Sequence, residues 1–306
     1  MMTALVSPAS TRANRRTDRA RGRGIRGGRQ VVPHIVLGAF IVYFALPFWW
    51  LLVASTKSQV TLFDGKTNPL WFGHFDFIAN IESLFTYSGG IYWHWLGNSF
   101  LYAFTGGLGA TVLSVFAGYG FAMYPFRGRG PFFSLLLGSV MVPVTALVIP
   151  LFVMFSSVHL TNTVWAVILP SMLNPFAVYL MRVYTQDAIP EPMVDAARMD
   201  GAGELRIFFQ VSLPLLRPAL VTVLLLSVVG TWNNYFLPLV MLSNTQLFPV
   251  TVGLGALQTQ AGVNTGGQSL WNIVITGALI SVIPLIASFL SLQKYWQGGL
   301  SLGSVK

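Results

Sequence analysis

Residues 218–293 read PALVTVLLLSVVGTWNNYFLPLVMLSNTQLFPVTVGLGALQTQAGVNTGGQSLWNIVITGALISVIPLIASFLSLQ and contain no Asp, Glu, Lys or Arg. Three more stretches, 30–56, 83–126 and 130–181, are equally free of charge. A helix needs about 20 apolar residues to cross the roughly 30 Å hydrocarbon core of a bilayer. The four stretches make up most of the 306 residues, so the sequence predicts an all-α protein that crosses a membrane several times.

Polar and glycine-rich segments divide these stretches into six predicted spans, near 32–54, 96–122, 131–154, 164–183, 216–241 and 271–292. A seventh span before residue 96 is disfavoured, because Ser88, Gly89 and Gly90 interrupt it and the aromatic residues that follow are typical of a membrane interface. A cleavable signal peptide over residues 1–55 is also disfavoured, since its apolar run exceeds the usual 7–15 residues. Four prolines are expected to kink or end spans: Pro143, Pro150, Pro170 and Pro175.

The composition excludes several classes of protein. Charged residues make up 9% of the chain and hydrophobic residues 54%, whereas soluble domains are about one quarter charged. Disordered chains are poor in apolar residues, so global disorder is excluded as well. With no cysteine, the chain has no disulfide, thiolate nucleophile or Cys-ligated zinc.

The excess positive charge is concentrated at the N-terminus, where residues 1–29 hold eight of the 18 basic residues. We interpret this segment as a disordered, Arg-rich cytoplasmic tail, in preference to a nucleic-acid-binding tail. Basic residues favour the cytoplasmic side of membrane proteins. Six spans with both termini in the cytoplasm leave only Lys57 and Lys66 on the outer side, which is the orientation we predict.

Three connecting loops are long enough to carry function. Two of them, 55–91 and 242–270, are predicted to be external and are either functional loops or solvated connectors. The third loop, 184–215, is predicted to be cytoplasmic and holds five of the nine acidic residues.

Two short helices are predicted within 184–215, joined by a turn at Asp200-Gly201. Pro192 suits the first position of the first helix, and Leu213-Pro214 ends the loop. Spacing of three and four residues places two apolar faces on these helices. The predicted faces are Met193, Ala196 and Ala197 on the first helix and Leu205, Phe208 and Phe209 on the second.

The same loop resembles a known motif. Asp195-Ala196-Ala197, Gly201 and Val211-Ser212-Leu213-Pro214 are similar to the E-A-A-x3-G-x9-I-x-L-P loop of binding-protein-dependent ABC importer permeases. Asp195 replaces Glu and Val211 replaces Ile, which keeps the charge sign and the shape. Residues 232–239 (WNNYFLPL) and 292–300 (LQKYWQGGL) resemble the carbohydrate-importing, maltose-type branch, and the resemblance covers about 30–306.

The resemblance implies a type I ABC importer permease fold in a bacterial or archaeal plasma membrane. It further implies a second homologous permease subunit, a cytoplasmic ABC ATPase dimer that holds ATP and Mg, and an extracytoplasmic solute-binding protein; no cofactor is expected in this chain. The residues implied to contact the ATPase are Asp195, Ala196, Ala197, Asp200, Gly201, Leu205, Leu213 and Pro214.

Catalysis and ion coupling by the chain alone are disfavoured. Gly65-Lys66-Thr67 matches the end of a phosphate-binding loop, but Val60 stands where the first glycine belongs. The four histidines lack metalloprotease spacing, so no metal ligands are predicted. No predicted span contains Asp or Glu, which argues against an ion-coupled carrier or an intramembrane enzyme.

A transport pathway for a neutral polar solute is predicted around Asn233 and Asn234. Their amides match sugar hydroxyls, and the neighbouring Trp232 and Tyr235 offer aromatic faces. Hydrogen bonding between helices is the equal alternative for these asparagines. Weaker pathway candidates are Asn98, Asn174 and Tyr179. We therefore predict import of a sugar or oligosaccharide, with glycerol phosphate or another polar solute as the alternative cargo.

Overall fold

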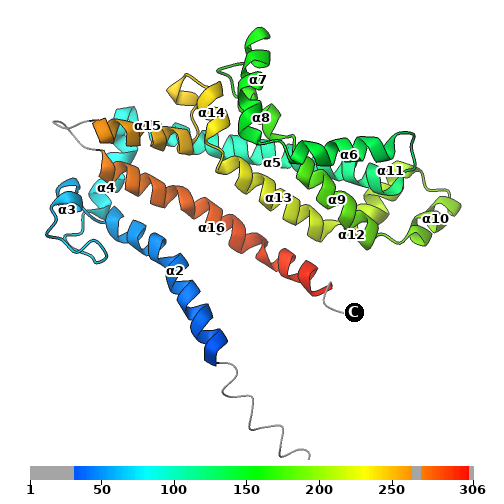
Figure 1. Ribbon diagram of the computed structural model, residues 1–306, viewed down its shortest axis with the longest axis horizontal. Helices are drawn as coiled ribbons and strands as arrows, with labels where there is room; N and C mark the ends of the chain where they lie inside the picture. The colour runs from blue at the N-terminus through cyan, green and yellow to red at the C-terminus, as the bar shows by residue number, and fades with distance from the viewer. Residues whose placement is uncertain (1–30, 264–269, 303–306) are drawn as a thin grey trace, which may run out of the picture.

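The computed structural model describes residues 31–263 and 270–302, and every regular element within these ranges is a helix. Helices α5 (Ile91–Met123), α13 (Arg217–Trp232) and α16 (Trp271–Leu302) run along the longest dimension of the molecule, with α13 packed between the other two (Figure 1). Helix α9 (Pro175–Ala188) packs against both α5 and α13. The predicted tail 1–29 lies outside the described residues.

Four described segments are long and apolar enough to cross a membrane as they stand. They are Val31–Ser55 (α2), Ile91–Met123, Trp165–Ala188 and Trp271–Gln293. Two bent helix pairs raise the number to six if each is one span. The prediction of an all-α, polytopic membrane protein is confirmed.

The predicted span near 131–154 is sharply bent. Helix α6 (Arg129–Val140) and helix α7 (Val144–Ser157) are separate and meet at an angle of 102°. Pro143 lacks an N–H and disfavours helical geometry at Val142. The bend at 141–143 therefore follows from Pro143, which was expected to kink or end a span.

Two other predicted spans are interrupted as well. Three residues separate helix α8 (Trp165–Ser171) from α9, whose first residue is Pro175. Helix α13 ends at Trp232, and helix α14 (Phe236–Met241) follows after a break of three residues. Pro238 explains this second break, because its ring has no N–H for the carbonyl of Asn234 and would clash with it in a continuous helix.

The predicted external loops contain helices. Loop 55–91 holds α3 (Gln59–Phe63), α4 (Phe77–Thr86) and the short 3₁₀ turn η1 (Tyr87–Gly89). Loop 242–270 holds η3 (Thr245–Leu247) and α15 (Val250–Val263). The interpretation of 242–270 as a solvated connector is wrong for α15, because this helix packs on α5 and α16 and buries Val250, Val252 and Leu257.

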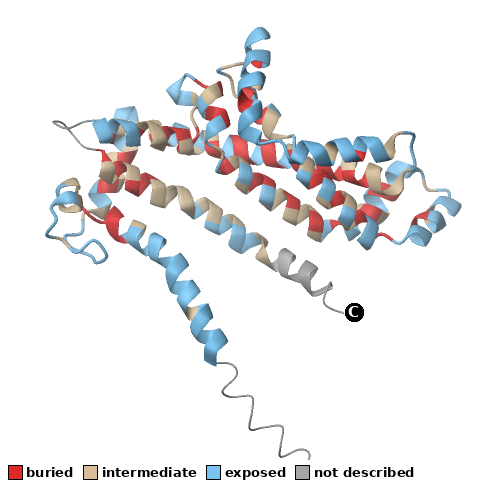
Figure 2. Ribbon diagram, viewed as in Figure 1, coloured by how far each residue is buried: buried red, intermediate tan, exposed pale blue. Residues whose placement is uncertain are grey.

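Small residues let α5 approach its neighbours closely. A Cβ on Gly107 would lie 2.6 Å from Val228 Cγ2 of α13, and one on Gly118 would lie 2.6 Å from Met181 Cβ of α9. Small residues at such contacts are typical of helix packing in membranes. The buried residues accordingly gather on α5, α9 and α13, whereas α2 is exposed along most of its length (Figure 2).

Candidate functional site

The loop between α9 and α13 forms two short helical segments joined by a tight turn. Helix α10 (Glu191–Met199) is followed by α11 (Glu204–Ile207), a π-helical turn η2 (Phe208–Ser212) and α12 (Leu213–Leu215). The turn after α10 is a Schellman motif, in which Gly201 N–H donates to Arg198 O and Ala202 N–H donates to Ala197 O, each at 3.0 Å. Gly201 has a φ of +77°, which explains the glycine at this position.

A polar cluster closes this turn. Arg198 Nε donates to Glu204 Oε1 at 2.8 Å, and Arg198 Nη1 donates to Asp195 Oδ1 at 3.1 Å. Tyr124, at the end of α5, donates its hydroxyl proton to Glu204 Oε2 at 2.6 Å. The hydrogen bond from Arg198 lowers the pKa of Glu204, and the same contact raises the pKa of Arg198. The cluster joins both halves of the loop to α5.

The two apolar faces predicted for this loop are wrong in part. Val194, Ile207 and Phe208 point into the core, whereas Met193 and Leu205 are exposed. The register is set by ring packing, because Phe208 lies 4.9 Å from the rings of both Phe116 and Tyr119 of α5. The predicted faces of Met193, Ala196 and Ala197 and of Leu205, Phe208 and Phe209 therefore keep only Ala197 and Phe208 against the core.

Most of the predicted coupling residues are nevertheless on the surface of this loop. Leu205 is 72% exposed although it is apolar, and the apolar Met199, which was not among the predicted residues, is 88% exposed. The remaining members divide into two groups. Asp195, Ala196, Asp200, Gly201 and Pro214 are exposed, and Ala197 and Leu213 are half-buried.

The predicted pathway residues Asn233, Asn234 and Tyr235 form the break between α13 and α14. Asn233 is exposed, and its Nδ2 donates to Val229 O at 3.0 Å. The carbonyl of Asn234, which Pro238 leaves without its helical donor, accepts a hydrogen bond from Thr251 Oγ1 at 3.0 Å. The Asn234 side chain accepts the N–H of Leu237 at 3.3 Å, so both of its oxygens stabilise the break.

Trp232 and Tyr235 differ in exposure on either side of this break. Trp232 is only 5% exposed, and its ring meets that of Phe100 edge to face at 5.0 Å. Tyr235 is 43% exposed and lies over Gly255 of α15, where a Cβ would approach the ring to 2.8 Å. Tyr235 presents an open aromatic face, and Trp232 belongs to the core.

The three weaker pathway candidates do not gather at the break. Asn174 caps α9 by accepting the N–H of Ala177 at 3.0 Å, and its Nδ2 donates to Ser227 Oγ of α13 at 3.4 Å. Tyr179 stacks on Phe133 of α6 at 6.3 Å. Asn98 uses its Nδ2 to hold the carbonyls of Gln246 and Phe248 around η3.

Several residues at these sites were not identified from the sequence. Arg198 and Glu204 complete the polar cluster, and the three-residue spacing of Asp195 and Arg198 is a signal for the ion pair. Thr251, which lies on α15, donates a hydrogen bond to the carbonyl at the break between α13 and α14. No local sequence pattern predicts this contact between distant segments. Among the described residues no group of three His, Asp or Glu side chains could hold a metal ion.

These features define a polytopic helical membrane protein with a surface-exposed loop between two spans and an interrupted helix inside the bundle. Comparison with known proteins identifies its family. The chain belongs to the binding-protein-dependent transport system inner membrane component family, which matches residues 110–300. It is therefore a transport permease subunit of an inner membrane.

Relatives extend the similarity to nearly the whole chain. The arabinooligosaccharides transport system permease protein AraQ of Halalkalibacterium halodurans is 34% identical over 269 residues, covering 88% of this chain and 94% of AraQ. The sn-glycerol-3-phosphate transport system permease protein UgpE of Salmonella typhi is 25% identical, covering 90% and 97%. A crystal structure of a bacterial ABC transporter involved in import of the acidic polysaccharide alginate contains a chain that matches with a TM-score of 0.75 and 25% identity, covering 96% of this chain and all of that one. The chain has an ABC importer permease fold.

Proposed function

We propose that this chain is the permease subunit of an importer for a neutral sugar or oligosaccharide, and that the segment α10–α12 receives force from a cytoplasmic ATPase dimer. The observation that carries the proposal is the exposed apolar surface beside the Gly201 turn. We define this coupling face as Ala196, Met199, Gly201 and Leu205.

The coupling face has the chemistry of a protein contact. Met199 and Leu205 lie outside the predicted spans and are largely exposed. Clustered exposed apolar side chains mark interaction sites in folded proteins. The Schellman turn and the Arg198 cluster hold this face in one shape, which lowers the entropy cost of binding a partner.

The same segment is packed firmly against the bundle. Phe208 stacks on α5, and Ser212 Oγ donates to Tyr119 OH at 3.2 Å within the core. Val194 and Ile207 join the same core cluster as Met181 of α9. A push on the coupling face would move α5 and α9 together, as alternating access driven by a partner requires.

The break between α13 and α14 supports an uncharged cargo. Asn233 offers an exposed amide and Tyr235 an exposed ring, and residues 218–263 contain no charged side chain. An amide both donates and accepts hydrogen bonds, which suits hydroxyl groups. The name of AraQ, an arabinooligosaccharides transport permease, agrees with a saccharide cargo, whereas that of UgpE keeps glycerol phosphate as the second candidate.

The proposed assembly contains a second homologous permease, an ATPase dimer that holds ATP and Mg, and an extracytoplasmic solute-binding protein. Both termini and loop 184–215 lie in the cytoplasm in this proposal. Its support is the distribution of basic residues together with the family assignment.

An uptake experiment in the native host tests the cargo. The coding sequence is deleted and restored as wild type, Asn233→Ala or Asn233→Gln, and uptake of labelled arabino-oligosaccharides and glycerol phosphate is measured. We expect oligosaccharide uptake with the wild type, loss with Ala and partial recovery with Gln at equal membrane levels. Uptake of glycerol phosphate alone would refute the proposed cargo, and transport by the purified single chain without ATP would refute the subunit role.

A further inference from the structure

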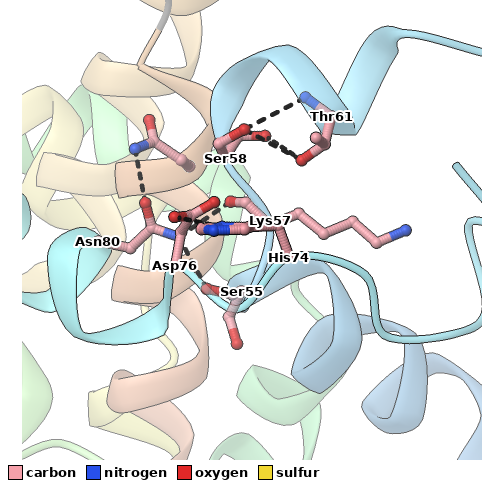
Figure 3. A network of polar contacts seen from close by, with 8 residues as sticks. Ser55, Lys57, Ser58, Thr61, His74, Asp76 and Asn80 are labelled. Carbon is pink, nitrogen blue, oxygen red and sulfur yellow. Dashed lines mark hydrogen bonds and ion pairs between the residues drawn. The ribbon is translucent and has the colours of Figure 1, made fainter.

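The end of α2 is joined to the loop that follows it by a polar network (Figure 3). Asn80 Nδ2 of α4 donates to the carbonyls of Ser55 and Lys57, both at 2.9 Å. Asn272 Nδ2 of α16 donates to Asn80 Oδ1 at 2.9 Å, and Asp76 N–H donates to Thr56 O at 2.8 Å. Both ends of the segment 58–75 are therefore held at the end of α2.

Between these fixed ends the segment folds back along α2. Lys57 Nζ donates to Asn68 O at 2.6 Å, and Trp49 Nε1 of α2 donates to Leu70 O at 2.9 Å. Trp49 lies six residues before the end of α2, which is about 9 Å along a helix. The segment 68–72 therefore lies beside the last turns of α2, on the N-terminal side of Ser55, where this helix ends.

Three aromatic side chains meet at this place, and we call Trp49, Trp71 and Phe72 the aromatic patch. The ring of Trp49 lies 5.8 Å from that of Trp71 and 5.5 Å from that of Phe72. Trp71 is 61% exposed and the other two are 38% exposed. The patch continues the exposed apolar side chains of α2, including Leu46 and Phe48.

The position of the patch along α2 matches a membrane boundary. From Val31 to Trp49 the helix rises about 27 Å, close to the roughly 30 Å thickness of the hydrocarbon core. This part of α2 belongs to the charge-free run 30–56, which lies between Arg29 and Lys57. Trp at such a boundary places an apolar ring and a polar N–H at the level of the headgroups.

We propose that the aromatic patch inserts into the lipid headgroup interface at the end of α2 and anchors segment 68–72 to the bilayer. The occupant of this surface is lipid, because the patch is continuous with the exposed apolar side chains of α2, a helix long and apolar enough to cross a membrane. Asp64 and Lys66 are the only Asp, Glu, Lys or Arg residues of segment 58–75, and both precede residues 68–72, which are uncharged. A soluble binding protein then contacts other parts of the external surface.

The absence of cysteine allows a direct test by nitroxide labelling. Single cysteines are introduced as Trp71→Cys and Phe72→Cys, with Leu46→Cys on α2 and Lys66→Cys in the exposed loop as references. The full-length chain is reconstituted in phosphatidylethanolamine and phosphatidylglycerol vesicles. Collision rates of each label with oxygen, which enriches in lipid, and with a water-soluble nickel complex are then measured by electron paramagnetic resonance.

We expect the ratio of oxygen to nickel collisions at 71 to be severalfold higher than at 66 and lower than at 46. The label at 72 provides a second reading from the same surface if Trp71→Cys does not reach the vesicles. A ratio at 71 and 72 equal to that at 66 would overturn the proposal in favour of an aqueous surface. Low collision rates with both reagents would overturn it in favour of a covering protein.

Discussion

Replacing Gly201 with serine tests whether the turn after α10 must keep its left-handed conformation. Gly201 has a φ of +77°, and an added Cβ would meet nothing within 4 Å, so the penalty comes from the backbone alone. An L-residue in this region costs roughly 1–2 kcal/mol, which is a factor of about 5 to 30 in an equilibrium constant. If ATPase docking requires this turn, Gly201→Ser weakens docking by up to that factor.

The same substitution two residues later provides the matched control. Gly203 also has open space around it, but its φ of −71° and ψ of 157° suit any residue. Gly201→Asn is the rescue variant, because Asn tolerates the left-handed region better than Ser. The assay compares ATP-dependent uptake, ATP hydrolysis and the membrane level of each variant in the assembled transporter.

We expect Gly201→Ser to lose uptake at a normal membrane level, Gly201→Asn to regain part of it, and Gly203→Ser to match the wild type. An equal loss at 201 and 203 would refute the conformational argument. Full uptake by Gly201→Ser would show that the coupling face works without this turn.

Three further outcomes follow from the geometry. Gly118→Ala places a Cβ 2.6 Å from a side chain of α9 and is expected to lower the free energy of unfolding by about 1–3 kcal/mol. The melting temperature of this variant in detergent should therefore be lower than that of the wild type. The control Gly120→Ala, whose Cβ would have nothing within 4 Å, should melt at the wild-type temperature. Because Arg198 lowers the folded-state pKa of Glu204, their contact stabilises the fold above the ordinary carboxyl pKa of 4.5, and this stabilisation is lost as the pH falls through the lowered pKa. The melting temperature of the wild type should therefore exceed that of Glu204→Gln by less as the pH falls below 4.5. A difference that stays constant with pH would contradict this. Asn98→Ala leaves two backbone carbonyls around η3 without their donor, so we expect a loss of about 1–3 kcal/mol in unfolding free energy, and an unchanged melting temperature would show that water replaces the amide.

That the chain crosses a membrane several times as helices could be predicted, because hydrophobicity accumulates over long windows. A run such as 30–56 has few stable alternatives to a membrane helix, whatever it packs against. The continuity of the spans was harder to predict. Pro143 was correctly expected to kink or end a helix, whereas Pro175 begins α9 and Pro150 and Pro170 lie inside α7 and α8. Pro238 was missed, although its lack of an N–H interrupts the bundle beside Asn234.

The candidate coupling residues were located by a short motif, whereas the face they present depended on packing. Phe208 and Leu205 are both apolar and lie on the same side of an ideal helix. The rings of Phe116 and Tyr119 select Phe208 for the core and leave Leu205 exposed. Packing also separates two of the predicted pathway residues: Trp232 is buried against Phe100, whereas Tyr235 is exposed.

The amino-acid sequence alone determined that this protein is helical, crosses a membrane and carries an acidic loop with a glycine turn, because each of these properties depends on neighbours within one helix or turn. Only the tertiary structure decided that α15 packs on α5 and that Thr251 satisfies the carbonyl freed at the break in the α13–α14 span. These outcomes depend on side chains from distant segments meeting in space, where close packing and the need to pair every buried polar group choose among conformations that are locally equivalent.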